Sequence, residues 1–136
     1  MTESALQNMT RSCLALLGYT ILETGKARSK QRCKRCGTES YATGWQGNTP
    51  GLPDLYIHAP WWKIPFGLGI ELKTATGVVR KEQAMLAHQG MTCICRNLGQ
   101  VLDAMKLAET LLGNPEQVEK IEGFERANTT ILADKK

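Results

Sequence analysis

A strand, a helix and a second strand follow one another between residues 68 and 96, and this order restricts the fold more than any other feature of the sequence. Residues 68–74 and 91–96 each have the composition of a short strand, and residues 79–89 between them have that of a helix closed by Gly90. A strand, a crossover helix and a strand in series require a right-handed parallel connection within one sheet. The sequence therefore predicts a sheet that contains a parallel pair.

Further elements are predicted on both sides of this unit. Thr2 is a candidate N-cap for a first helix, strands are predicted over 19–22 and 54–59, and Asn97 with Gln100 forms a capping pair for a last helix. The apolar stripe of the first helix is Leu6, Met9, Cys13, Leu16 and Leu17. The stripe of the last helix is Val101, Met105, Ala108 and Leu112. The order α-β-β-β-α-β-α places the chain in the α/β or α+β class, with a small mixed sheet flanked by helices.

The 136 residues suit one domain. We expect this domain to span residues 1–112, with a basic insertion at about 25–50 and a polar C-terminal extension over 113–136. No apolar run reaches the length of a membrane span, and the N-terminus lacks the features of a signal peptide. These observations predict a cytoplasmic protein without a membrane partner.

The insertion carries a dense run of cations without an acid, in a chain whose net charge is only +4. Its members are Lys26, Arg28, Lys30, Arg32, Lys34 and Arg35. Five of the six stand at alternate positions, so an extended segment would present them on one face, where they could follow a phosphate backbone. A solvated basic loop is the alternative; we favour DNA binding because the acids lie elsewhere.

The residues that carry chemistry are Asp54, which follows Gly51-Leu52-Pro53, and the pair Glu71 and Lys73. On a strand, Glu71 and Lys73 share one face, while the apolar neighbours point to the other. If the two strands form a hairpin, Asp54 and Glu71 can converge on one ion. Two carboxylates suit Mg²⁺, and a nearby lysine can orient water or stabilise charge in phosphodiester hydrolysis. The alternative is a surface Glu–Lys pair beside an unrelated turn aspartate.

Pro53-Asp54 followed by Glu71-Leu72-Lys73 resembles the signature of the PD-(D/E)xK nuclease superfamily. The wider pattern is similar to its VRR-NUC branch, which has an early glutamate, G-x-P-D, E-x-K and a glutamine in the next helix. In this sequence the additional positions are Glu3 and Gln83. The resemblance spans residues 2 to 108 and implies a restriction-endonuclease-like α-β-β-β-α-β core.

The resemblance also implies a role for each matching residue. Asp54 and Glu71 would bind the metal with the Leu72 carbonyl as third ligand, and Lys73 would position the attacking water. Gln83 would support Lys73 or the substrate, and Glu3 would reach the metal directly or through water. Glu3 could instead serve only the helix dipole, and Gln83 could lie on an exposed helix face.

The expected function is that of a Mg²⁺- or Mn²⁺-dependent endonuclease selective for branched DNA such as four-way (Holliday) junctions, a DNA-repair activity. Stand-alone members of the resembling family imply a homodimer with two active sites. The alternatives are a flap or restriction-like nuclease, and a non-catalytic DNA-binding module organised by zinc.

The five cysteines leave the zinc alternative open. Cys33 and Cys36 have the spacing of half a zinc site, but Cys93 and Cys95 lack the matching C-x-x-C and suit small buried side chains better. We therefore favour no structural Zn²⁺ within one chain, and zinc shared between two chains through Cys33 and Cys36 is an alternative.

The connector between the second and third strands contains Trp61, Trp62 and Phe66. We expect it to form an exposed patch for a partner chain or for unstacked bases, with a buried roof over the sheet as the alternative. His58 and His88 receive no role.

Overall fold

The computed structural model describes residues 1–24, 30–32, 35–37, 39–41, 51–130 and 132. In chain order its elements are α1 (Glu3–Leu16), β1 (Thr20–Glu23), β2 (Lys30–Arg32), β3 (Glu39–Tyr41), β4 (Leu55–His58), the 3₁₀ turn η1 (Pro60–Trp62), β5 (Leu68–Leu72), α2 (Lys81–His88), β6 (Cys93–Cys95), α3 (Leu98–Leu111) and α4 (Pro115–Ala127).

The central element is a four-stranded mixed sheet in the order β1-β4-β5-β6. The β1–β4 and β4–β5 pairs are antiparallel, whereas β5 and β6 are parallel and are connected through α2. The parallel connection predicted for residues 68–96 is confirmed, as is the mixed α/β class. The two ends of the predicted strand at 91–96 are not part of β6, which covers only Cys93–Cys95.

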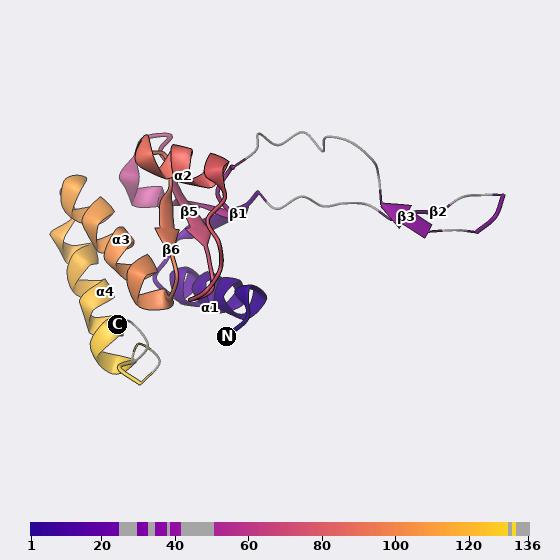
Figure 1. The fold of residues 1–136 in the computed structure, drawn as a ribbon. Coiled ribbons are helices and arrows are strands. Elements are labelled where there is room, and N and C mark those ends of the chain that lie inside the picture. Colours follow the sequence, from indigo (N-terminus) through magenta and orange to yellow (C-terminus); the bar gives the residue numbers. More distant parts are fainter. Residues whose placement is uncertain (25–29, 33–34, 38, 42–50, 131, 133–136) are drawn as a thin grey trace.

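The helices cover both faces of this sheet (Figure 1). Ile70 and Leu72 are fully buried in the core that β5 shares with α1 and α3. Because side chains alternate along a strand, Glu71 points to the opposite face, where Gln83 of α2 contacts it. The sheet therefore separates an apolar layer from a polar layer under α2.

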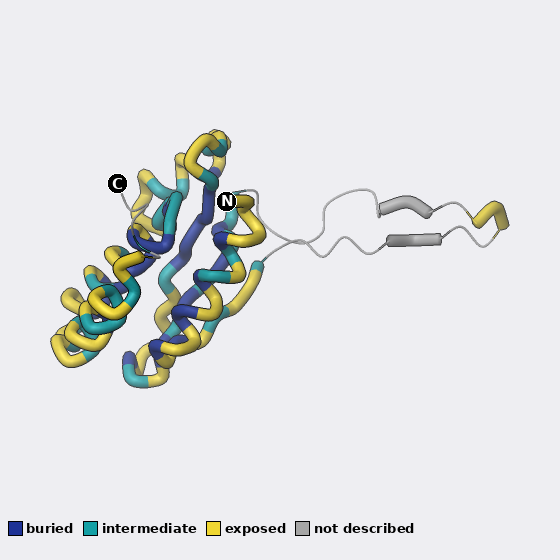
Figure 2. The backbone as a smooth tube through the Cα atoms, turned by 90° about the horizontal axis from the view of Figure 1, so that it is seen from below, coloured by how far each residue is buried: buried dark blue, intermediate teal, exposed yellow. Residues whose placement is uncertain are grey.

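The first and third helices begin as the sequence predicts. The Thr2 hydroxyl accepts a hydrogen bond from the Ala5 N–H, and the Asn97 side chain accepts one from the Gln100 N–H. Buried residues follow the strands and the inner sides of the helices (Figure 2). One expected core residue is placed wrongly: Leu16 is 74% exposed, and Leu14 is buried in the core.

Helix α4 occupies most of the segment that we expected to be a polar extension. It packs along α3, and its Ile121 is fully buried in the common core. Lys106 of α3 forms an ion pair with Glu125 of α4 at 2.6 Å. The domain therefore continues beyond residue 112, and the reason is an apolar face at Val118, Ile121 and Phe124 in an otherwise charged helix.

The basic insertion contributes the antiparallel pair β2–β3, which forms a sheet of its own. Lys30 pairs with Tyr41 and Arg32 with Glu39. Residues 30–32 are therefore extended, as the interpretation of the alternating cations requires. Among the described residues, no helix combines the length and apolar character that a membrane span requires.

Candidate active site

Asp54 and Glu71 are brought together by two reciprocal hydrogen bonds between their strands. The Asp54 N–H donates to Glu71 Oε2 at 3.1 Å, and the Leu72 N–H donates to Asp54 Oδ2 at 2.9 Å. The Glu71 carboxylate thus binds the backbone N–H of Asp54, and the Asp54 carboxylate binds the backbone N–H of the residue after Glu71. The hairpin on which the sequence prediction depended is present, because β4 and β5 pair antiparallel with Leu55 opposite Ile70.

Glu71 and Lys73 form a buried ion pair on the face under α2. Their relative exposures are 2% and 8%, and Lys73 Nζ lies 3.6 Å from Glu71 Oε1. The Lys73 N–H donates to the Cys95 carbonyl, which extends the β5–β6 pairing past Leu72. A surface Glu–Lys pair is thus excluded, since burying two charges is costly unless each has a partner or a use.

Gln83 joins the same cluster from α2 and is 2% exposed. Its Nε2 donates to Glu71 Oε1 at 2.6 Å, while its Oε1 accepts from the Arg80 N–H at 2.9 Å. The acceptor end of the amide is therefore occupied by the start of its own helix, so the donor end must face Glu71. The alternative of an exposed glutamine is wrong.

The electrostatics of the cluster centre on Glu71. Burial and the nearby Asp54 carboxylate raise the pKa of Glu71 from 4.5 to about 7, against the lowering effects of Lys73 and of the Asp54 N–H. Glu3 adds a smaller raising effect on this pKa. Two close carboxylates with one ammonium leave an excess of negative charge, and a divalent cation would relieve it.

Two glycines allow the strands and α2 to approach this closely. A Cβ on Gly51, whose φ is +86°, would lie 2.7 Å from the Glu82 backbone at the start of α2. A Cβ on Gly69 would lie 2.9 Å from Pro53 Cγ and from the Met91 carbonyl. The G-x-P-D turn thus packs directly against the helix that carries Gln83, and only glycine fits at its first position.

The remaining predicted metal ligands are placed less closely. Glu3 is exposed at the first turn of α1, and it acts on Glu71 only electrostatically. Leu72 is fully buried, and its N–H is the donor to Asp54. Within the described ranges, no group of three or more His, Cys, Asp or Glu side chains is arranged to hold a metal ion. A metal would therefore depend on Asp54 and Glu71, with backbone oxygen and water completing its coordination.

The predicted DNA-binding and zinc residues lie in and around the insertion. Lys30 and Arg32 belong to β2, and Arg35 and Cys36 are exposed. Lys26, Arg28, Cys33 and Lys34 lie outside the described residues. Cys95 is buried in the core and Cys93 packs against it, so the second cysteine pair consists of small core side chains, as favoured. Burial also raises the pKa of the Cys95 thiol to about 12.

A second buried carboxylate, Glu109, was not predicted. It is fully buried and accepts hydrogen bonds from Tyr19 Oη at 2.6 Å, Trp62 Nε1 at 2.6 Å, Asn114 Nδ2 at 3.0 Å and Trp61 Nε1 at 3.1 Å. The position of Glu109 within the apolar stripe of the last helix, eight residues after Val101, was the available signal.

This network also corrects the interpretation of the connector. Trp62 is 6% exposed and belongs to the core, and Trp61 is partly buried beside Tyr19. The expected exposed aromatic patch is therefore wrong for the tryptophans, because their N–H groups find an acceptor inside the protein. Phe66 is 38% exposed and packs on Trp62.

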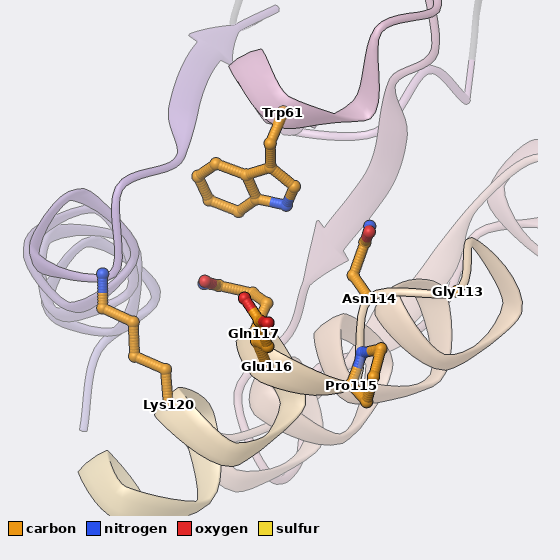
Figure 3. Close-up of a pocket in the computed structure, with 7 residues that line it drawn as sticks. All are labelled: Trp61, Gly113, Asn114, Pro115, Glu116, Gln117 and Lys120. Atoms are coloured by element: carbon orange, nitrogen blue, oxygen red, sulfur yellow. The ribbon is translucent and has the colours of Figure 1, made fainter.

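The pocket in Figure 3 lies between Trp61 and the start of α4, with Gln117 and Lys120 on its other wall. Its volume is about 520 Å³, and none of Asp54, Glu71, Lys73 and Gln83 lines it. The candidate active site is thus a packed polar cluster separate from this pocket.

Comparisons of the chain with protein-family models, with curated proteins and with solved structures find no match.

Proposed function

We propose that this protein is a metal-dependent endonuclease whose active site consists of Asp54, Glu71, Lys73 and Gln83. The observation that carries the proposal is the buried ion pair of Glu71 and Lys73, in which Lys73 Nζ lies 3.6 Å from Glu71 Oε1. The carboxylate of Asp54 lies beside this pair. A protein gains little stability from such a pair, since its desolvation cost offsets its attraction. A use in chemistry explains its presence better.

The topology supports a restriction-endonuclease-like core of the VRR-NUC type. Without the β2–β3 pair, the elements α1, β1, β4, β5, α2 and β6 follow the α-β-β-β-α-β order that the resemblance implies. Asp54 directly precedes β4, Glu71 lies near the end of β5, and Lys73 directly follows β5. The G-x-P-D and E-x-K motifs therefore meet at one site in this order of elements.

The donor set fits a hard divalent cation. Asp54 and Glu71 would hold Mg²⁺ or Mn²⁺, with the Leu72 carbonyl and water as further oxygen ligands. When bound, the cation would polarise the scissile phosphate and lower the pKa of a water molecule. Gln83 holds the Glu71 carboxylate in place by its hydrogen bond at 2.6 Å. The Lys73 ammonium would orient the attacking water and stabilise the negative charge that develops on the phosphoryl group.

We further propose branched DNA as the substrate and a homodimer as the acting form. The basic residues of the insertion support DNA as the partner, because phosphate contacts dominate affinity without reading sequence. Binding of this kind suits an enzyme that selects the shape of DNA, such as a four-way junction, and two copies related by a twofold axis would cut paired strands. A flap or restriction-like nuclease is the competing enzymatic proposal.

The test is Mg²⁺-dependent cleavage of a labelled four-way junction, a flap and a linear duplex in parallel. Lys73→Ala and Asp54→Asn should each lower the cleavage rate by about 100-fold or more. The matched controls Lys120→Ala and Asp103→Asn, on α4 and α3, should retain the wild-type rate. Equal rates for the site variants and the wild type would contradict the active site. Equal cleavage of junction and linear duplex would contradict the selectivity for branched DNA.

A further inference from the structure

Arg96 lies directly after β6 and reaches across the end of β5 to the turn that follows Lys73. Its Nη1 donates to the carbonyl oxygens of Thr74 at 2.7 Å, Gly77 at 2.8 Å and Ala75 at 3.3 Å. One guanidinium nitrogen therefore donates hydrogen bonds to three backbone carbonyl oxygens of a single turn. Hydrogen bonds with a charged donor are stronger than those between neutral groups.

Much of the turn lies at the surface. Ala75 and Thr76 are exposed, and a pocket of about 490 Å³ lies against residues 74–76 and Arg96. Within the turn, the Gly77 N–H donates to the Thr74 carbonyl at 3.1 Å. Without the guanidinium, the carbonyls that converge on it would repel one another and turn toward water.

The position of this turn matters because it connects two parts of the candidate active site. Lys73 precedes it, and the segment after it leads to α2 and Gln83. Lys73 is held on one side by the hydrogen bond from its N–H to the Cys95 carbonyl at 2.9 Å. On the other side, the next carbonyl in the chain, that of Thr74, accepts from Arg96.

We propose that Arg96 is a positioning residue that fixes the Lys73 backbone and the approach to α2, so that Lys73 and Gln83 converge on Glu71. The role in catalysis rests on the proposed nuclease function. Arg96 acts through the turn, because its Nη1 is directed to the three carbonyls. Its loss should therefore lower kcat and leave KM for DNA unchanged.

The experiment compares wild type, Arg96→Ala and Arg96→Lys, with Arg11→Ala as the matched control. Arg11 also carries a guanidinium with a partner, Glu23 at 3.3 Å, but on the exposed side of α1. Two measurements are made at a temperature at which all four proteins are folded. The first is steady-state cleavage of a labelled four-way junction in Mg²⁺, which separates kcat from KM. The second is amide hydrogen exchange at Lys73 and Gly77, which does not depend on activity.

Arg96→Ala should lower kcat at least about tenfold with KM within about twofold of wild type, as expected for a misplaced catalytic group. Arg96→Lys should recover part of kcat, and Arg11→Ala should match wild type. Exchange at Lys73 and Gly77 should become faster in Arg96→Ala alone. Unchanged exchange, an unchanged kcat, or a loss confined to KM would each overturn the proposal.

Absence of cleavage by the wild type on every DNA would contradict the proposed nuclease function instead. The exchange comparison then decides on Arg96 by itself. Faster exchange at both Lys73 and Gly77 would support its positioning of the turn, and unchanged exchange at either would overturn it.

Discussion

Glu71 and Glu109 are both buried carboxylates, but their surroundings differ in a way that separates chemistry from structure. Each oxygen of Glu109 accepts from at least two neutral donors, so its hydrogen-bonding capacity is satisfied without a cation. Among the described residues, Glu71 has a single neutral side-chain donor, Gln83, and it lies between the Asp54 carboxylate and the Lys73 ammonium. Burial alone therefore does not identify an active site. The useful criterion is unbalanced charge around the buried group.

The largest expected effect is on stability at Glu109. Glu109→Leu replaces the carboxylate with an apolar side chain and leaves Tyr19, Trp61, Trp62 and Asn114 without their acceptor. The free energy of unfolding should fall by about 3–5 kcal/mol, as for breaking a buried polar network. Urea denaturation measures it, with the exposed Glu119→Gln as the control. A loss no greater than that of the control would show that the network does not stabilise the connector.

At Glu71, we expect the free energy of unfolding to depend on pH. Its pKa of about 7 in the folded protein exceeds 4.5, so between these pH values the folded state binds more protons than the unfolded state. The stabilising effect of protonated Glu71 is complete below about pH 4.5 and is lost as the pH rises through 7. A shift of this size corresponds to roughly 3 kcal/mol.

The measurement is the denaturation midpoint from pH 5 to 8 without divalent cations, for wild type and Glu71→Gln. The variant should lack this part of the pH dependence, because its side chain does not ionise. An identical pH dependence in both proteins would assign the effect to other groups and would contradict the charged environment described for Glu71.

The sequence reveals one of these two carboxylates and not the other, for a physical reason. Glu71 stands two residues before Lys73 on an apolar strand, so strand alternation alone places both charges on one face. Glu109 depends on donors from Tyr19, η1 and Asn114, which only the tertiary fold brings together. Local patterns predict groups that share an element, whereas a network between distant elements needs their packing.

The same distinction applies to the rest of the fold. The four strands of the central sheet, α2 and the parallel connection follow from local periodicity and were predicted, with ends that differ by one or two residues. Helix α4 was missed because its apolar face is narrow and most of its residues are charged or polar. Arg96 was missed because its hydrogen bonds reach carbonyls more than 18 residues earlier in the chain.

A smaller effect is expected on metal binding. Mg²⁺ needs the ionised form of Glu71, whose pKa is about 7 without metal, so the proton and the metal compete. The apparent affinity for Mg²⁺ should therefore rise about tenfold between pH 6 and pH 8. Isothermal titration of the protein with MgCl₂ measures the affinity. Glu109→Gln, which changes a carboxylate outside the proposed metal site, is the control and should show the same pH dependence as the wild type. An affinity that is independent of pH would exclude Glu71 as a ligand.

The smallest expected effect comes from Asn114→Ala, which removes one of the four donors to Glu109. The carboxylate keeps three donors, so the free energy of unfolding should fall by only about 1 kcal/mol. Gln83→Ala is the matched variant, because it removes the single neutral side-chain donor to Glu71. Both are compared by urea denaturation and by Mg²⁺ titration. Asn114→Ala should leave Mg²⁺ affinity unchanged, whereas Gln83→Ala should alter it, since only Gln83 holds a carboxylate that would bind the cation. If both variants changed the affinity equally, the division between a structural and a chemical carboxylate would be wrong.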